Sequence, residues 1–346
     1  MELKKADFFS RLKDIYYRKN PPNEEKLFPV LTEVCEVLEN EDDEVRPRGD
    51  EGKNQNLPGG IIKLNPDLPL VIIPDIHARM GFIMSVLFFP LDPGATVLDR
   101  LCDGSIQLLC LGDGFHSEGT SKRWRLALDE FASQYKRHKN MDQEMIESLG
   151  TMEMVMNLKI LFPRLFHFLK GNHENILNEE DHGNYPFRKY AYEGAMVLEY
   201  MKKFYSGDFL NTYARFEKNL PLLAIGNSYL ISHAEPLEFF AYRSVLNYRH
   251  YPDVIRGLTW TDNDQADDDS VQEMLAHYLS PELAEDAFYF GGHRHVLDAY
   301  QLRAKGRFVQ INHPKKYMIA HIHENGVFNP DTDIFEINDI KIPLSL

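Results

Sequence analysis

The sequence predicts an α/β (α+β) protein in which two β-sheets pack together and helices lie outside them. In the first half of the chain, short apolar runs alternate with helical patterns, which is typical of a layered α/β architecture. In the second half, strand-like runs follow one another closely and include a hairpin signal. The apolar content of 43% over 346 residues is sufficient for a large core.

Two helices are expected first, because apolar residues recur at helical spacing from Phe8 to Tyr16 and from Leu27 to Leu38. The polar segment from Asn40 to Gly60 is rich in charges and contains Gly and Pro. It reads as a loop or linker and is the best candidate for local disorder.

The next run, Leu68 to Asp75, is apolar throughout, as in a strand buried on both faces of a parallel sheet. Strands and helices then alternate, which gives a βαβαβ order. The expected elements are a helix at 81–89, a strand at 105–113, two amphipathic helices between about 122 and 162, a strand at 165–172 and a helix at 187–205.

The remaining chain favours antiparallel strands. Residues 222–233 contain two short apolar runs around a Gly-Asn-Ser turn, which predicts a hairpin. Further strand-like runs are present at 287–293, 298–303, 306–312, 316–323 and 326–329.

The composition excludes several classes of function. With 38 Lys and Arg against 53 Asp and Glu, the net charge is −15, so we expect no general binding of nucleic acid. The three cysteines, Cys35, Cys102 and Cys110, form no CxxC pair and fit a cytoplasmic protein with reduced thiols. No apolar run is long enough to cross a membrane, so no membrane association is expected.

Polar residues of one kind follow five of the apolar runs. Each short motif alone is usually a turn or a buried histidine, but ligand-binding side chains in α/β sheets collect at the carboxyl ends of strands. Five such ends in one order therefore predict a metal site. The residues are Asp75, His77, Asp113, Asn172, His173, His233, His293 and His295.

These side chains offer oxygen and imidazole nitrogen and no thiolate, which suits Mn, Fe, Zn or Ni, with Mn the expected ion in vitro. One carboxylate can bridge two ions about 3.5–4 Å apart, and such a pair can hold the attacking and leaving oxygens of a phosphoryl group. The pair also lowers the pKa of bound water, which makes a hydroxide nucleophile near neutral pH.

The motif series D-x-H, G-D, G-N-H-E, H and G-H-x-H resembles the calcineurin-like metallophosphoesterase superfamily. Residues 156–174, 216–236 and 257–264 resemble its phosphoprotein (serine/threonine) phosphatase branch, and residues 307–314 do so more loosely. The resemblance implies a four-layer sandwich of two mixed sheets flanked by helices. The resemblance covers roughly Leu70 to His323. We expect a catalytic domain at 61–346, after an N-terminal helical extension and polar loop at 1–60.

The resemblance also implies roles for the motif residues. Asp75 and His77 would bind the first of two divalent or trivalent ions, and Asp113 would bridge both. Asn172, His233 and His293 would bind the second ion, and His295 would complete the first site. His173 would be the general acid that protonates the leaving alkoxide.

The second motif departs from the branch pattern G-D-x-x-D-R-G, because this chain reads GDGFHSEG from Gly112. His116 stands in place of the Asp that would orient the catalytic His, and Ser117 in place of a phosphate-binding Arg. Glu118 is a conjectured substitute for the orienting Asp. The candidate substrate-binding residues are Arg249, Arg294 and His116.

The stretch from Thr120 to Gly150 looks like an insertion relative to this branch. Its pattern is that of a solvated helix with one apolar face, and the alternative is a cap over the site.

The leading prediction is a phosphatase that hydrolyses phosphate monoesters, on a phosphoprotein or a small phosphoester, by attack of a bimetal-bound hydroxide. A dinucleoside polyphosphate or nucleotide hydrolase is the alternative within enzymes. A metal-binding regulatory protein with weak or no catalysis is the alternative of another class. The acidic charge disfavours a nuclease.

Overall fold

The computed structural model describes residues 2–118 and 121–339 and contains two large mixed β-sheets, as the sequence predicted. Thr120 of the predicted insertion and the last residues of the predicted catalytic domain, 340–346, lie outside the described residues. Within the described part of the chain, no helix is long and apolar enough to cross a membrane.

The first sheet has five strands, and its neighbouring strands β2, β5 and β6, the last at the edge of the sheet, are parallel. Their ends are in register, because Ile73 pairs with Cys110 and Cys110 pairs with Phe168. The loops that follow these strands therefore start at one edge. In spatial order the strands are β13 (Ile334–Ile337), β12 (Tyr317–Ile322), β2 (Leu70–Ile73), β5 (Gln107–Cys110) and β6 (Phe166–Phe168).

The second sheet has six strands, and β8, β9 and β11 run parallel at its centre. Ile231 pairs with Phe290, so β8 and β9 also end together. In spatial order the strands are β1 (Ile61–Lys63), β7 (Leu223–Ile225), β8 (Tyr229–Ser232), β9 (Phe288–Gly291), β11 (Phe308–Gln310) and β10 (Gln301–Arg303). A separate small ribbon joins β3 (Pro90–Asp92) and β4 (Ala95–Thr96).

Alternate side chains of the strands point to opposite faces, and this divides the core. Ile72 and Leu109 of the first sheet pack with Ile231 and Phe290 of the second, all fully buried. Their neighbours on the strands, such as Val71, pack against helices instead. The result is the predicted four-layer order of helices, sheet, sheet and helices, which is confirmed.

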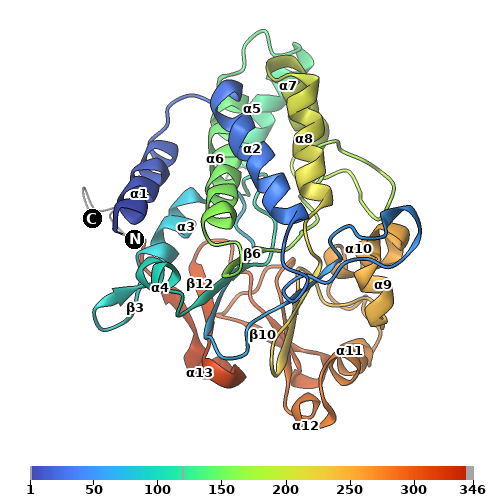
Figure 1. The fold of residues 1–346 in the computed structure, drawn as a ribbon. Helices are drawn as coiled ribbons and strands as arrows, with labels where there is room; N and C mark the ends of the chain where they lie inside the picture. The colour runs from blue at the N-terminus through green and yellow to red at the C-terminus, as the bar shows by residue number, and fades with distance from the viewer. Residues whose placement is uncertain (1, 119–120, 340–346) are drawn as a thin grey trace.

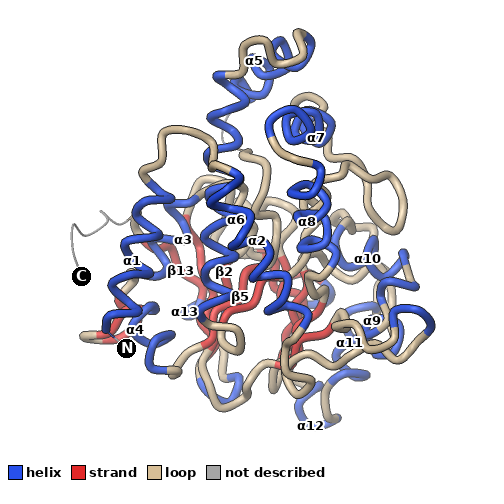
Figure 2. The backbone as a smooth tube through the Cα atoms, turned by 45° about the horizontal axis from the view of Figure 1, so that its top comes forward, coloured by secondary structure: helices blue, strands red, loops and turns tan. Residues whose placement is uncertain are grey.

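One helical layer contains α1, α2, α3 and α6 to α8, and the other contains α9 to α11 (Figures 1 and 2). The α-helices are α1 (Glu2–Tyr16), α2 (Glu24–Glu39), α3 (Met80–Leu87), α4 (Val97–Asp103), α5 (Ser121–Ala132), α6 (Lys139–Leu161), α7 (Glu193–Phe204), α8 (Gly207–Lys218), α9 (Tyr242–Leu246), α10 (Pro252–Thr259), α11 (Ser270–Tyr278), α12 (Pro281–Ala284) and α13 (Pro330–Asp333). Short 3₁₀ turns are η1 (Gly52–Asn54), η2 (Tyr248–His250), η3 (Ala304–Gly306) and η4 (Glu324–Gly326).

The segment from Asn40 to Gly60 is anchored by buried charges, which its polar composition does not suggest. Arg46 is fully buried and forms an ion pair of 2.9 Å with Glu41. Its guanidinium also donates to the carbonyls of Gly59 and Asn219, and Lys159 of α6 donates to Glu41. These bonds fix the segment to α6 and to the end of α8.

Other elements differ from expectation. The predicted strand at 326–329 is irregular after η4, whereas β1 and β13 form strands that were not predicted. The predicted helix at 187–205 begins only at Glu193, and residues 187–192 form a loop. That loop lies beside the site described next.

Candidate metal centre

Five loops bring the predicted ligands together, and each loop follows a strand whose end is aligned with its neighbours. Backbone bonds tie the loops: the His77 amide donates to the Asp113 carbonyl at 2.7 Å, and the Gly292 amide donates to the His233 carbonyl at 2.7 Å. Asp75 and His77 follow β2, Asp113 follows β5, Asn172 follows β6, His233 follows β8 and His293 follows β9.

Three ligand positions have left-handed backbone, with φ of 46° at His77, 51° at Asp113 and 63° at His293. This conformation costs free energy for a residue with a side chain and is concentrated at functional sites. Gly292 also has a close neighbour, because an added Cβ would lie 2.0 Å from the Asp75 carboxylate. The backbone of these loops is thus held in conformations that bring the ligand side chains together.

Glu174 of the GNHE motif holds two of these loops. Its buried carboxylate accepts from the amides of Asp113 and Gly114, each at 2.9 Å, and of Gly171 at 2.7 Å. Hydrogen bonds to a charged acceptor are the strong ones. Glu174 therefore fixes the loop of Asp113 against the loop of Asn172, a role that the sequence motif did not reveal.

Asp113 lies between two groups of potential ligands. Within each group, one ligand atom per residue lies within 4.8 Å of the others. Asp113 Oδ2 is 3.4 Å from His233 Nε2 and 3.9 Å from His77 Nε2. The two groups are Asp113 with His77 and His173, and Asp113 with His233 and His293.

The spacing of the atoms fits a cation. His77 Nε2 lies 3.8 Å from Asp75 Oδ2 and 3.7 Å from Glu118 Oε2, beyond hydrogen-bond distance. Two ligands about 2.1 Å from a tetrahedral ion are about 3.4 Å apart. On the other side, Asn172 Oδ1 is 3.0 Å from His233 Nε2 and 3.1 Å from His293 Nδ1.

The electrostatics also fit a site for cations. Burial raises the pKa of Asp75 to about 8, and burial together with the Asp75 charge raises that of Asp113 well above its usual value. Burial lowers the pKa of His77 and His293 to about 4, so these imidazoles are neutral. Acidic oxygens beside neutral nitrogens, with no protein cation among them in the described chain, form a donor set suited to divalent metal ions.

Asn312 orients Asp75 and was not among the predicted residues. Its buried side-chain amide donates to Asp75 Oδ2, and the His293 amide donates to Oδ1 at 3.3 Å. Asn312 follows β11, a strand of the second sheet. Such partners of ligands commonly set their orientation.

His173 and His116 form a pair. Their Nδ1 atoms are 3.2 Å apart, so one ring donates and the other accepts. His173 Nε2 is left on the Asp113 side, 3.7 Å from Oδ2. The ring of Phe187 packs on His173 with centroids 3.7 Å apart. His116 therefore lies behind His173 and, although it was predicted to bind substrate, does not line the cavity described below.

Glu118 and His295 bond to each other at the edge of the site, with His295 Nε2 2.7 Å from Glu118 Oε2. His295 is in neither of the two ligand groups. Glu118 has no contact with His173 among its described hydrogen bonds and ion pairs, unlike the conjectured orienting role. Instead, its other oxygen Oε1 binds Lys189.

A cavity of about 660 Å³ opens above these side chains. None of the described residues 121–150 lines it, so the described part of the predicted insertion is not a cap; α5 packs on α6 and α7 instead. The lining residues are His77, Asp113, Glu118, Asn172, His173, Pro186, Phe187, Arg188, Lys189, Trp260, Asp262, Asn263, His293, Arg294 and His295.

The predicted substrate-binding arginines differ in position. Arg294 lines the cavity, and its guanidinium pairs with Asp262. Arg249 is elsewhere: it donates to the carbonyl of Pro58 and, at 2.8 Å, to the side chain of Asn219. The structure thus brings Arg294 to the site and gives Arg249 a place in the packing of the segment before β1.

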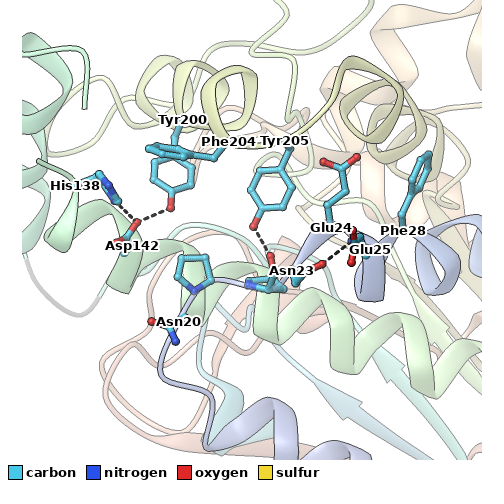
Figure 3. A pocket seen from close by; sticks show the side chains of 12 residues that line it. Asn20, Asn23, Glu24, Glu25, Phe28, His138, Asp142, Tyr200, Phe204 and Tyr205 are labelled. Atoms are coloured by element: carbon cyan, nitrogen blue, oxygen red, sulfur yellow. Dashed lines mark hydrogen bonds and ion pairs between the residues drawn. The ribbon is translucent and has the colours of Figure 1, made fainter. Parts of the chain in front are cut away.

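A second cavity of about 780 Å³ lies between the α1–α2 connection and α7 (Figure 3). It is larger, but three of its titratable groups are bonded to one another: His138 Nδ1 lies 2.7 Å from Asp142, which also accepts from Tyr200. It contains none of the predicted ligands, so the chemistry is assigned to the cavity above Asp113.

A helix-flanked sandwich of two mixed sheets is consistent with the metallophosphoesterase fold, so the predicted resemblance is confirmed at the level of the fold. The structure is similar to a protein serine/threonine phosphatase from Saccharomyces cerevisiae with similarity to human phosphatase PP5. The TM-score is 0.54 at 15% identity, covering 93% of this chain and 92% of that one.

A cold-active protein-tyrosine phosphatase of a psychrophilic Shewanella species is less similar, with a TM-score of 0.46 at 13% identity over 80% of this chain and 83% of that one. No protein-family model matches the chain, and no curated protein matches it in sequence.

Proposed function

We propose that this chain is a metal-dependent phosphatase that hydrolyses phosphate monoesters. The observation that carries the proposal is Asp113, whose carboxylate is shared by two ligand groups at the floor of an open cavity. The fold shared with a serine/threonine phosphatase supports phosphoproteins as one substrate class.

In this proposal, Asp75 and His77 hold one ion, and Asp113 contributes to both. When bound, two ions supply Lewis-acid stabilisation of the phosphoryl charge and lower the pKa of water. His295 is left out, because its ring nitrogen bonds Glu118. The second ion is held by Asn172, His233 and His293.

His173 is the proposed general acid. Its Nδ1 is engaged by His116, so the protonated ring would donate from Nδ1 to His116, give the proton on Nε2 to the leaving oxygen and become neutral. Phe187 covers one face of the ring and limits its rotation.

The test is a substrate screen on protein loaded with manganese, coupled to metal analysis. The panel contains aryl phosphates, phosphopeptides, nucleotides and dinucleoside polyphosphates; the last two are included because Phe187 and Trp260 line the cavity and could stack on a base. Metal binding without hydrolysis of any compound would instead favour a regulatory protein.

Two variants separate the proposed roles. Asp113→Asn should lose both bound metal and turnover. His173→Asn should keep the metal and lose about 10²- to 10⁴-fold in kcat, the usual contribution of general acid catalysis. If His173→Asn lost its metal as well, the general-acid assignment would be rejected.

A further inference from the structure

The cavity needs a cation for a phosphate group, and Ser117 cannot supply one. The Ser117 side chain is turned away and donates to Glu144 at 2.7 Å, while Arg123 of α5 donates to Ser117 Oγ at 2.6 Å. Arg123 itself is paired with Glu144 and Glu147 and does not line the cavity. The arginine nearest this motif is thus committed to the packing of α5 on α6.

Three cationic side chains line the cavity among the described residues, and each has a partner of its own, but only one partner reaches the metal-ligand residues. Arg294 is paired with Asp262 through two nitrogens. The Arg188 guanidinium lies over the ring of Tyr192, 5.9 Å from its centroid. The third is Lys189, whose ammonium binds the Glu118 carboxylate, and the other oxygen of that carboxylate is 3.7 Å from the metal-facing nitrogen of His77.

The backbone around Lys189 is fixed. Glu193, fully buried at the start of α7, accepts from the Lys189 amide at 3.0 Å and the Ala191 amide at 3.1 Å. The Gly194 amide donates to the Phe187 carbonyl at 3.1 Å. The loop therefore presents Phe187 to His173 and Lys189 to Glu118 in one arrangement.

We infer that Lys189 is the residue that binds the substrate phosphate in place of the missing arginine, an inference that rests on the proposed function. An ammonium has three donors, and Glu118 uses one of them, so two remain for phosphate oxygens. Glu118 holds the ammonium one carboxylate away from His77, at the wall of the cavity in which the proposed substrate would bind.

The test measures binding of inorganic orthophosphate to the manganese-loaded protein by calorimetry, together with its inhibition constant and the KM for an aryl phosphate. Lys189→Met should raise the dissociation and inhibition constants for orthophosphate by about 10- to 150-fold, the range for one hydrogen bond to a charged group. Manganese content should not change. Lys189→Arg, which keeps the charge, should stay within about threefold of the wild type on the same scale.

The matched control is Lys202→Met on α7, where an exposed lysine pairs with Glu199 away from the cavity. It should bind orthophosphate like the wild type. The inference is overturned if Lys189→Met binds orthophosphate within twofold of the wild type, or if the loaded wild type binds none. Failure of the proposed function is a separate result: orthophosphate binding that depends on Lys189, without hydrolysis of any substrate.

Discussion

Replacing Glu174 by Gln tests how the Asp113 loop is held. The carboxylate accepts three amides, from Asp113 and Gly171 on Oε2 and from Gly114 on Oε1. A glutamine has one acceptor oxygen, so at best two bonds remain and its NH₂ group faces the third amide. Losing one hydrogen bond to a charged group costs about 1.5–3 kcal/mol.

That loss corresponds to about 10- to 150-fold in an equilibrium constant, at about 1.4 kcal/mol per factor of ten. Because this loop carries Asp113, we expect most of the lost free energy to appear as weaker manganese binding. Residues that hold a metal ligand in place usually contribute about 10- to 100-fold to metal affinity. Calorimetric titration of manganese measures the change, with circular dichroism to verify folding. The control is Glu199→Gln on α7, which loses an exposed pair with Lys202 away from the cavity. A folded Glu174→Gln protein that bound manganese within twofold of the wild type would refute the reasoning.

Three further outcomes follow from buried charges and ligands. Glu41→Gln leaves Arg46 and Lys159 buried without a counter-charge and should lower the free energy of unfolding by about 3–5 kcal/mol. The unfolding entropy of 346 residues is about 0.7 kcal/mol/K, so calorimetry should show a Tm lower by about 4–7 °C. Burial tends to raise the pKa of Glu41, but Lys159 and Arg46 outweigh it and lower the pKa to about 2. The unfolded value is about 4.3, so this stabilisation is complete above about pH 4.3 and is lost as the pH falls toward 2, and the variant should show a flatter acid profile. Arg249→Met should lower Tm and leave the KM for an aryl phosphate within twofold of the wild-type value. A raised KM at unchanged Tm would show instead that Arg249 contacts the substrate. Chelation should lower Tm reversibly, because an ion that binds only the folded state stabilises it, and an unchanged Tm would argue against metal at these ligands.

The first half of the fold could be predicted because its strands are continuous apolar runs. Buried on both faces, β2 and β5 have no polar alternation, and each run stops at a polar ligand, Asp75 or Asp113. Strand ends in register bring such residues to one edge, so the ligand motifs could be placed without knowing the loops. Short strands with weaker patterns, such as β1 and β13, gave no comparable signal.

The rest of the site depends on contacts between distant segments. Lys189 reaches Glu118 because Glu193 holds the backbone of its loop. The two residues are 71 positions apart, so the sequence around either one does not predict their ion pair. Arg249 precedes a family-like segment, yet its side chain turns to Pro58 because the Asn40–Gly60 segment folds against it. A sequence pattern describes neighbours along the chain, whereas these roles are set by tertiary packing.

The proposed metal ligands come from both sheets, so metal binding depends on how the two sheets are aligned. Asp113 belongs to the first sheet and His233 to the second, and Ile231 and Phe290 lie in the apolar layer directly between the sheets. A small slide of one sheet over the other would separate the donors on the two sides of an ion. A core substitution such as Phe290→Leu, at a residue that does not line the cavity, should therefore first weaken metal binding.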